Sequence, residues 1–273
     1  MKPYVVLDKK LGQTPLEAIR QWKAAHPAYA DVPASYAGRL DPMADGLLLV
    51  LLGDACKKKD AYTKLDKEYE VEVLLAMGSD TGDVLGIVAQ GEPCAEPSAQ
   101  TLRATLAREE GTHLRPYPAF SSKTAGGIPL FEHALRGTLG TIAIPEHEET
   151  IYAIALRSMR QAPVAELQAR VKEMLAAAPK SDEVSKVLGA DFRIHDVRNS
   201  WQPFFLESDR SYAVIRIRVA CASGAYMRSL AQRIGATLGT QAIALSIRRT
   251  RLGSYKRFGP FGIWTRQFRL TTY

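Results

Sequence analysis

A carboxylate on a short loop between two glycines is the feature of this sequence best suited to chemistry. Asp41 lies between Gly38 and Gly46, and Pro42 follows it directly and keeps its backbone out of the helical region. The apolar run Leu47–Leu52 comes next and predicts a buried segment that braces the loop. A carboxylate on a braced loop can act as a nucleophile or a base. An Asp-Pro pair by itself is more often a plain turn, so both interpretations stay open at this point.

The elements expected around this loop are strands and helices in no regular alternation. Alternating apolar residues predict strands over Glu68–Leu75 and Tyr212–Cys221. Helical spacing and capping residues predict helices over Pro15–Lys23, Ser98–Glu110, Pro163–Ala178 and Arg228–Leu238. Because strands and helices do not alternate regularly, the pattern predicts an α+β fold rather than a doubly wound sheet.

Composition excludes several classes of protein. Apolar residues make up 46% of the 273 residues, as in ordinary globular proteins, and the longest apolar run is too short to cross a bilayer. Asp8 stands where a signal peptide would still be apolar, so we expect a protein that stays in the cytoplasm. The 3 cysteines and 5 histidines are scattered, which predicts neither a disulfide framework nor a metal site.

The basic residues are unevenly distributed along a chain of net charge +7. The segment from Arg210 to Tyr273 contains 12 Lys or Arg and no Asp or Glu. Aromatic residues lie among these arginines, a composition that favours a surface for nucleic acid over a merely solvated face.

Six blocks of the sequence, in order, resemble the motifs of one enzyme family. The blocks are Asp8–Thr14, Gly38–Lys57, Asp66–Tyr69 with Gly78–Asp83, Tyr117–Ser121 with Gly127–Glu132, Cys221–Leu230, and Ile247–Thr250. Together they resemble the TruB-like tRNA pseudouridine synthases. This resemblance implies a mixed, mainly antiparallel sheet with flanking helices. It also implies that residues 1–255 are the catalytic domain. We interpret residues 160–209 as an inserted helical segment on its surface, and residues 256–273 as a basic aromatic tail that leaves no room for the family's PUA domain.

The resemblance also implies the reaction and its principal residues. The family isomerises uridine to pseudouridine in RNA and needs no cofactor. Asp41 would be the essential carboxylate, either as a nucleophile on the sugar or by enabling a glycal route. Arg228 would pair with Asp41 and hold it ionised and aimed. Tyr69 would stack on the flipped uracil, although without the resemblance a strand tyrosine would be a core residue.

Further residues are assigned to substrate binding by their place in the motifs. Ile247 would close the base pocket, and Lys67 flanks Tyr69 in its motif. Arg248 and Arg249 would contact the RNA backbone. Two positions depart from the family pattern, because Tyr36 replaces a histidine and Arg39 replaces a threonine. Tyr36 could stack on RNA, while Arg39 resembles the arginine of the ribosomal-RNA and RluA-like synthases that assists base flipping.

The sequence therefore predicts an RNA pseudouridine synthase that modifies the T-loop uridine of tRNA (position 55). One alternative keeps the chemistry and changes the substrate to ribosomal or other RNA. Another is a non-catalytic RNA-binding or RNA-folding protein. We expect a monomer whose partner is RNA, with no membrane, metal or cofactor.

Overall fold

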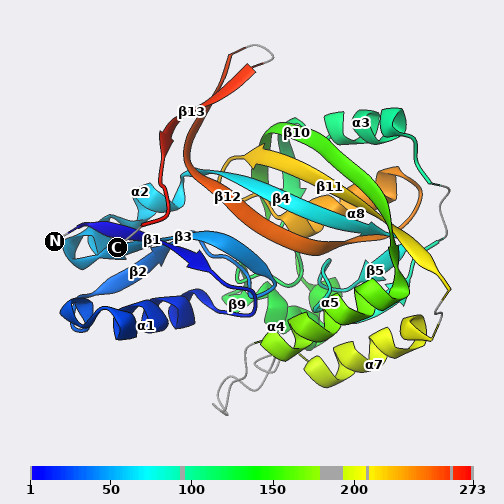
Figure 1. The fold of residues 1–273 in the computed structure, drawn as a ribbon, viewed down its shortest axis with the longest axis horizontal. Coiled ribbons are helices and arrows are strands. Elements are labelled where there is room, and N and C mark those ends of the chain that lie inside the picture. Colours follow the sequence, from blue (N-terminus) through cyan, green and yellow to red (C-terminus); the bar gives the residue numbers. More distant parts are fainter. Residues whose placement is uncertain (1, 93–95, 179–192, 207–208, 259–260, 272–273) are drawn as a thin grey trace.

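A nine-stranded mixed sheet organises the described part of the chain, which comprises residues 2–92, 96–178, 193–206, 209–258 and 261–271 of a computed structural model (Figure 1). The strand order is β1-β3-β12-β4-β11-β10-β7, with β2 paired to β3 and β13 to β12. All of these pairings are antiparallel except that of β3 with β12. The predicted α+β class, with a mainly antiparallel sheet and flanking helices, is confirmed.

The strands of this sheet are β1 (Tyr4–Lys9), β2 (Ala34–Ala37), β3 (Ala44–Leu52), β4 (Asp66–Leu75), β7 (Gly111–Pro116), β10 (Glu146–Pro163), β11 (Ser211–Cys221), β12 (Ala242–Phe258) and β13 (Phe261–Gln267). Two small hairpins pair β5 (Met77–Ser79) with β6 (Val88–Gln90), and β8 (Thr124–Ala125) with β9 (Ile128–Pro129). The α-helices are α1 (Pro15–Ala25), α2 (Lys59–Thr63), α3 (Ala99–Ala107), α4 (Leu130–Leu135), α5 (Val164–Ala177), α7 (Ile194–Phe205) and α8 (Met227–Thr237). Short 3-10 helices cover Pro27–Tyr29, Gly53–Lys58 and Leu139–Thr141.

Local signals in the sequence explain several of these elements. The side chain of Thr14 accepts a hydrogen bond from the backbone of Glu17 at 3.2 Å, and the Glu17 carboxylate accepts one from the backbone of Thr14 at 2.6 Å. This reciprocal capping box begins α1 at Pro15, as predicted. The predicted strands correspond to β4 and β11, and the apolar run Leu47–Leu52 lies in β3.

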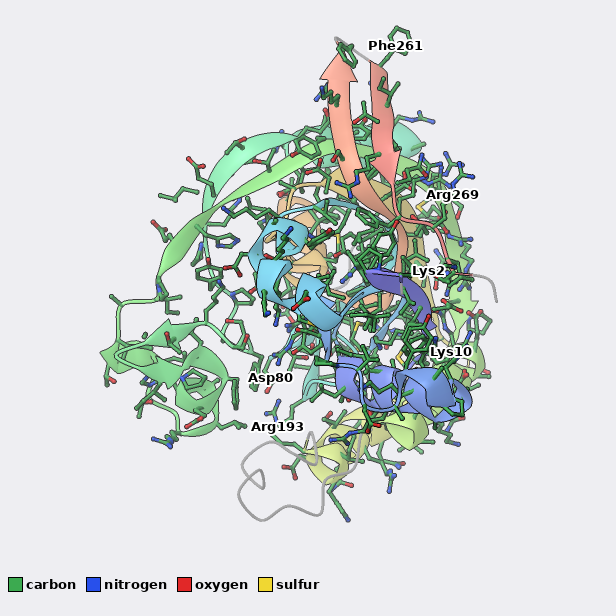
Figure 2. The ribbon with its side chains drawn as sticks, turned by 90° about the vertical axis from the view of Figure 1, so that its left-hand side faces the viewer. Lys2, Lys10, Asp80, Arg193, Phe261 and Arg269 are labelled. Carbon is green, nitrogen blue, oxygen red and sulfur yellow. The ribbon has the colours of Figure 1, made fainter. Side chains whose placement is uncertain are left out.

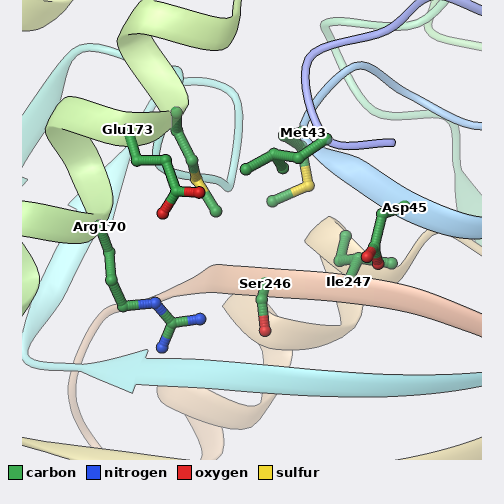
Figure 3. Close-up of a pocket in the computed structure, with 8 residues that line it drawn as sticks. Met43, Asp45, Arg170, Glu173, Ser246 and Ile247 are labelled. Carbon is green, nitrogen blue, oxygen red and sulfur yellow. The ribbon is translucent and has the colours of Figure 1, made fainter. Parts of the chain in front are cut away.

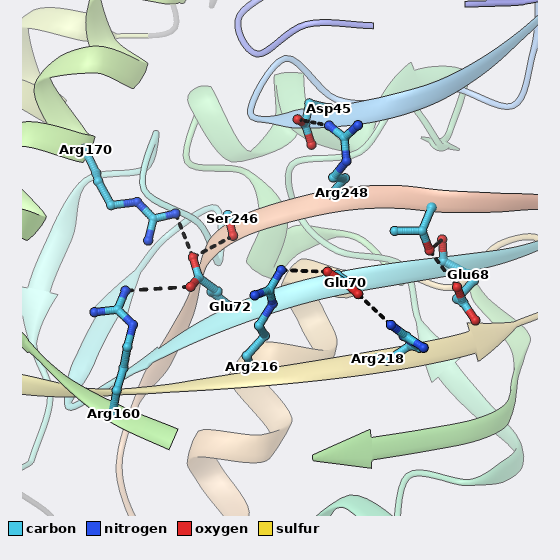
Figure 4. Close-up of polar contacts among 11 residues, drawn as sticks. Asp45, Glu68, Glu70, Glu72, Arg160, Arg170, Arg216, Arg218, Ser246 and Arg248 are labelled. Atoms are coloured by element: carbon cyan, nitrogen blue, oxygen red, sulfur yellow. Dashed lines mark hydrogen bonds and ion pairs between the residues drawn. The ribbon is translucent and has the colours of Figure 1, made fainter. Parts of the chain in front are cut away.

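The alternating strands β4 and β11 bury one face and pair charges on the other. Val71 of β4 lies opposite Ile217 of β11, and both are buried in the main core. On the other face Glu70 accepts hydrogen bonds from Arg216 at 2.7 Å and Arg218 at 2.9 Å (Figure 4). The acid-free segment after residue 209 is therefore neutralised in part by acids of the neighbouring strand.

The segment interpreted as an insertion contributes helices to the main core. The predicted helix Pro163–Ala178 corresponds to α5, and α7 lies beside it (Figure 1). Val171 of α5 and Trp201 of α7 are both buried in the same core cluster as the central strands. Residues 179–192 of this segment lie outside the described residues.

Part of the segment interpreted as a basic tail forms a hairpin. Residues Gly253–Phe258 of β12 pair with β13, and these paired strands project beyond the body of the sheet (Figure 1). None of the helices in the described ranges combines the length and the apolar character that crossing a membrane requires.

Candidate active site

Asp41 lies on the loop that connects β2 to β3, and buried neighbours fix this loop. Leu40 and Met43 are 3% and 2% exposed and anchor it in the main core. Gly46 has φ +101° and faces the backbone of Arg249 so closely that any Cβ would collide with it. The Asp41 side chain itself is 38% exposed. The loop therefore presents its carboxylate to solvent from a rigid base.

Arg228, near the start of α8, holds that carboxylate. Its Nε donates to Asp41 Oδ2 at 3.2 Å and lies 3.5 Å from Asp83 Oδ2. Its Nη1 and Nη2 donate to the carbonyls of Thr81 at 2.6 Å and Phe120 at 3.0 Å. Burial opposes the charge of Arg228, but Asp41 and Asp83 outweigh it and raise its pKa further. The structure thus brings together the predicted pair Asp41 and Arg228, whose residues lie 187 positions apart.

Asp83 is a second carboxylate of this site that sequence reasoning did not single out. It is 5% exposed, and its Oδ1 accepts hydrogen bonds from the Thr81 hydroxyl at 2.8 Å and the Leu85 backbone at 2.9 Å. Burial raises its pKa, while Arg228 and these donors act in the opposite direction. Asp83 closes the motif block Gly78–Asp83, so its position in that block was the available signal.

Tyr69 lies in β4 beside the loop and is 7% exposed. The guanidinium of Arg249 lies over its ring, 5.6 Å from the centroid. Burial raises the pKa of the Tyr69 phenol, and Asp41 is near enough to raise it further, against the opposing charge of Arg249. A buried phenol with a raised pKa stays protonated at neutral pH.

Arg249 does not have the exposure that a contact with the RNA backbone requires, so this part of the sequence interpretation is wrong. It is 1% exposed, and its guanidinium donates to the carbonyls of Gly38 at 3.4 Å and Arg39 at 2.7 Å. The sequence shows an arginine among strand residues but not the side of the strand on which it lies. The structure makes Arg249 a buried support of the Asp41 loop.

Lys67 is corrected in the same way. It is 5% exposed, and its Nζ donates to the carbonyls of Thr63, at 3.1 Å, and Leu65. Burial lowers the pKa of Lys67 to about 8. Its ammonium supports the connection between α2 and β4, and its burial does not give it the exposure that a contact with RNA requires.

The other predicted binding residues lie in different surroundings. Arg39 is exposed next to Asp41, and within the described ranges its side chain has no ion-pair partner. Arg248 is half-exposed and pairs with Asp45 at 2.5 Å and Asp8 at 3.3 Å. Tyr36 packs against the cluster under α1, with the ammonium of Lys59 5.0 Å from its ring centroid. Of these, Arg39 is the cation best placed to meet a ligand at Asp41.

Ile247 is buried, and it lines a small pocket beside the Asp41 loop. This pocket has a volume of about 160 Å³ and lies between the start of β3, β12 and α5 (Figure 3). Its wall includes Asp45, Arg170 and Glu173, whereas Asp41 is not among its lining residues. The prediction that Ile247 closes a base pocket over Asp41 therefore stays a prediction.

Lys9, which was not among the predicted site residues, supports the Asp41 loop from β1. Lys9 is fully buried, and its Nζ donates to the carbonyls of Lys10 at 3.1 Å and Gln13 at 2.8 Å; burial lowers its pKa to about 8. Within the turn that it holds, the backbone N–H of Gly12 donates to the carbonyl of Pro42 at 2.9 Å. Lys9 thereby braces the residue that follows Asp41.

An aromatic cluster stands near Asp41 on the side of α8. Tyr117 stacks on His147 at 4.0 Å, and Tyr226 packs edge-on against both rings. Burial raises the pKa of Tyr226 to about 12, with Asp41 adding to the effect.

In the described part of the chain, no group of three His, Cys, Asp or Glu side chains is arranged to hold a metal ion.

The fold and this site define a class of protein. The structure resembles one chain from the crystal structure of a Cbf5–Nop10–Gar1 complex with a TM-score of 0.54 and 18% identity, over 92% of this chain and 48% of that chain. This likeness gives the pseudouridine-synthase fold. The profile of the TruB family pseudouridylate synthases (N-terminal domain) matches residues 30–174. The chain belongs to the TruB family, and the predicted family is confirmed.

Two relatives within the family are each 28% identical to this chain over the aligned residues. It is 28% identical to tRNA pseudouridine synthase B of Bordetella avium over 253 residues, which is 92% of this chain and 81% of that protein. It is also 28% identical to tRNA pseudouridine synthase B of Cupriavidus metallidurans, over 91% of this chain but only 62% of that protein. Against that second relative, the chain spans less than two thirds of the full length.

Proposed function

We propose that the protein isomerises uridine to pseudouridine in RNA and that its substrate is the T-loop uridine of tRNA. The observation that carries this proposal is a single carboxylate, Asp41, held half-exposed by a buried arginine on the fold of the TruB family. The tRNA substrate is supported by the tRNA pseudouridine synthases B to which the chain is similar.

The reaction needs no second reactant, and this suits a site built around one exposed carboxylate. The N1–C1′ bond of the uridine breaks, the uracil turns, and C5 joins C1′. The hydrogen on C5 is lost and N1 gains one, so the atoms balance within one nucleotide and water. Asp41 either attacks C1′ or enables formation of a glycal, and Arg228 holds its carboxylate in position in both routes.

Tyr69 and Arg39 complete the proposed chemistry. A uridine must leave its stack to reach Asp41, and an aromatic ring replaces part of the stacking that it loses. Tyr69 supplies that ring, and its protonated phenol supplies an O–H for the proton steps. Arg39, exposed beside Asp41, assists base flipping and attracts the phosphates.

The test compares Asp41 on the loop with Asp45 at the start of β3. A tRNA transcript labelled with tritium at C5 of uridine releases the label when C5 loses its hydrogen. We expect the wild type to release it, Asp41→Asn to release none, and Asp41→Asn to bind the transcript within about twofold of wild type. Asp45→Asn is the matched control, since Asp45 at the start of β3 pairs with Arg248, and it should retain turnover.

The outcome with altered RNA tests the substrate. Replacing the T-loop uridine by cytidine should abolish tritium release. Release that persists from this transcript refutes the T-loop position, and release that appears only with ribosomal RNA fragments refutes the tRNA assignment. Both results leave the proposed chemistry intact. Release by Asp41→Asn equal to wild type refutes the site.

The remaining parts of the proposal concern organisation. We assign the chemistry to residues 1–255 with the segment 160–209 as an insertion, and we place a monomeric protein in the cytoplasm, where tRNA is available. Analytical ultracentrifugation at micromolar concentration tests the oligomeric state, and we expect the mass of one chain.

A further inference from the structure

Arg193 connects the segment before α7 to the site that surrounds Arg228. Its backbone is left-handed at φ +51°, and its side chain is 20% exposed. Nη1 lies 2.6 Å from Asp80 Oδ2, and the guanidinium lies over the ring of Phe120, 4.7 Å from the centroid. Figure 2 shows Arg193 and Asp80 directed toward one another. One guanidinium therefore touches two segments that are distant in sequence.

Each of these two segments gives one carbonyl to Arg228. Thr81, next to Asp80, accepts from Nη1 of Arg228, and Phe120 accepts from Nη2 through its backbone. Asp80 is itself tied back, because its Oδ1 accepts the Ile87 N–H at 2.8 Å. A chain of contacts thus runs from Arg193, through Asp80 and Phe120, to Arg228 and the carboxylate of Asp41.

The rest of α7 follows the same segment. The indole N–H of buried Trp201 donates to the carbonyl of Val84 at 3.1 Å. The hydroxyl of Ser200 accepts the N–H of Val88 at 3.0 Å. Together with Arg193, the helix contacts the segment 80–88 at three points. We infer that α7 holds this segment in place.

We propose that Arg193 is a positioning residue for the reaction, acting through Arg228 and without touching the substrate. This rests on the proposed function. The two side chains are 20% and 34% exposed, and partly exposed ion pairs contribute modestly to stability, so we place the main effect of the Arg193–Asp80 contact in geometry. Without this contact, Arg193 no longer connects the two segments whose carbonyls fix Arg228. Arg228 then holds the carboxylate of Asp41 less well in position. Misplacing a reacting group by about 1 Å can cost a factor of roughly 100 in rate.

The test measures single-turnover kinetics with enzyme in excess over tRNA. Arg193→Ala should lower the rate constant by roughly tenfold to a hundredfold. Its RNA affinity should stay within about twofold of wild type, and its reaction amplitude should stay equal to wild type. Arg193→Lys, which keeps the charge but loses the flat stack on Phe120, should lie between. Arg198→Ala is the matched control, because it removes an exposed arginine from the same helix, and it should react like wild type.

Three results overturn the proposal. An unchanged rate constant shows that the Arg193 contact is only a surface pair. A weaker affinity with an unchanged rate constant makes Arg193 an RNA contact. A lower amplitude with an unchanged rate constant makes its role one of folding.

A measurement without RNA separates this inference from the proposed function. Amide hydrogen exchange over residues 80–88 and 117–121 should be faster in Arg193→Ala than in wild type and Arg198→Ala. Equal exchange overturns the link even if the protein turns over RNA. Faster exchange in a protein that never acts on RNA refutes the proposed function and retains the link.

Discussion

Arg228 has two roles that a pair of substitutions can separate. It aims the exposed carboxylate of Asp41, and it neutralises the buried carboxylate of Asp83. Arg228→Met removes both. Taking one partner from a buried ion pair costs about 3–5 kcal/mol in unfolding free energy, because the remaining charge is left without compensation. We therefore expect Arg228→Met to lose turnover and also to lose several kcal/mol of stability.

Adding Asp83→Asn should restore most of the stability and none of the turnover. The amide oxygen of an asparagine can accept the hydrogen bonds from Thr81 and Leu85. The substitution therefore removes the buried charge and leaves both donors with an acceptor. The carbonyls of Thr81 and Phe120 still lack their donor, which leaves a residual loss of about 1–3 kcal/mol. Urea unfolding and tritium release from the same preparations measure the two roles.

The pH dependence gives the same pair of roles an independent check. Burial already raises the pKa of Asp83, and without Arg228 nothing of comparable charge opposes that rise. Folded Arg228→Met then binds a proton at a pH where the unfolded chain does not, so its stability increases as the pH falls. The difference between wild type and Arg228→Met should shrink from pH 8 to pH 5. A difference that is constant over this range, or a double variant no more stable than Arg228→Met, would refute the reasoning.

The remaining predictions concern Tyr69, Arg39 and Lys9. Tyr69→Phe should bind RNA like wild type and lose most turnover. Tyr69→Ala should in addition bind RNA more weakly, because it loses stacking worth about 1–3 kcal/mol. If both variants behave like wild type, Tyr69 is a core residue. Arg39→Ala should reduce the slope of log affinity against log salt by about one with unchanged melting temperature, and an unchanged slope would exclude a phosphate contact. Burial lowers the pKa of Lys9 to about 8, so above pH 8 the unfolded chain holds the extra proton and folding gains stability. Relative to Lys9→Met, wild type should gain on the order of 3 kcal/mol between pH 7.5 and 10.5, as measured by urea unfolding; no relative gain would show that Lys9 titrates normally.

The sequence predicted elements whose signals are local. The Thr14 capping box and the alternation of β4 and β11 are decided by neighbours within a few residues, and the structure has them where they were expected. Motif blocks also identified Asp41 and Arg228, which the fold brings to 3.2 Å. That contact is not visible in spacing, because it depends on how α8 packs against the β2–β3 loop.

What the sequence could not show is which charges are buried and which are paired. No acid occurs between Arg210 and Tyr273, but the register of β4 against β11 sets Glu70 opposite Arg218. Glu68 of β4 likewise pairs with Arg251 at 3.4 Å. A count along the chain treats these arginines as free for a polyanion, whereas the sheet supplies their partners. Arg249 was misassigned for a different reason, because the sequence does not show that its side chain lies on the buried side of β12.

Three buried cations from distant elements explain how an irregular loop can hold a reactive group. The loop between β2 and β3 lies outside the helices and strands, so the entropy of ordering it must be offset largely by contacts from elsewhere. Lys9 of β1 braces the turn that binds Pro42, Arg249 of β12 holds the carbonyls of Gly38 and Arg39, and Arg228 of α8 holds the carboxylate. Each donor is buried, while Asp41 remains accessible. Buried cations can fix the position of an exposed carboxylate and of its loop without covering the carboxylate. A carboxylate that must meet a nucleotide from solvent needs this arrangement.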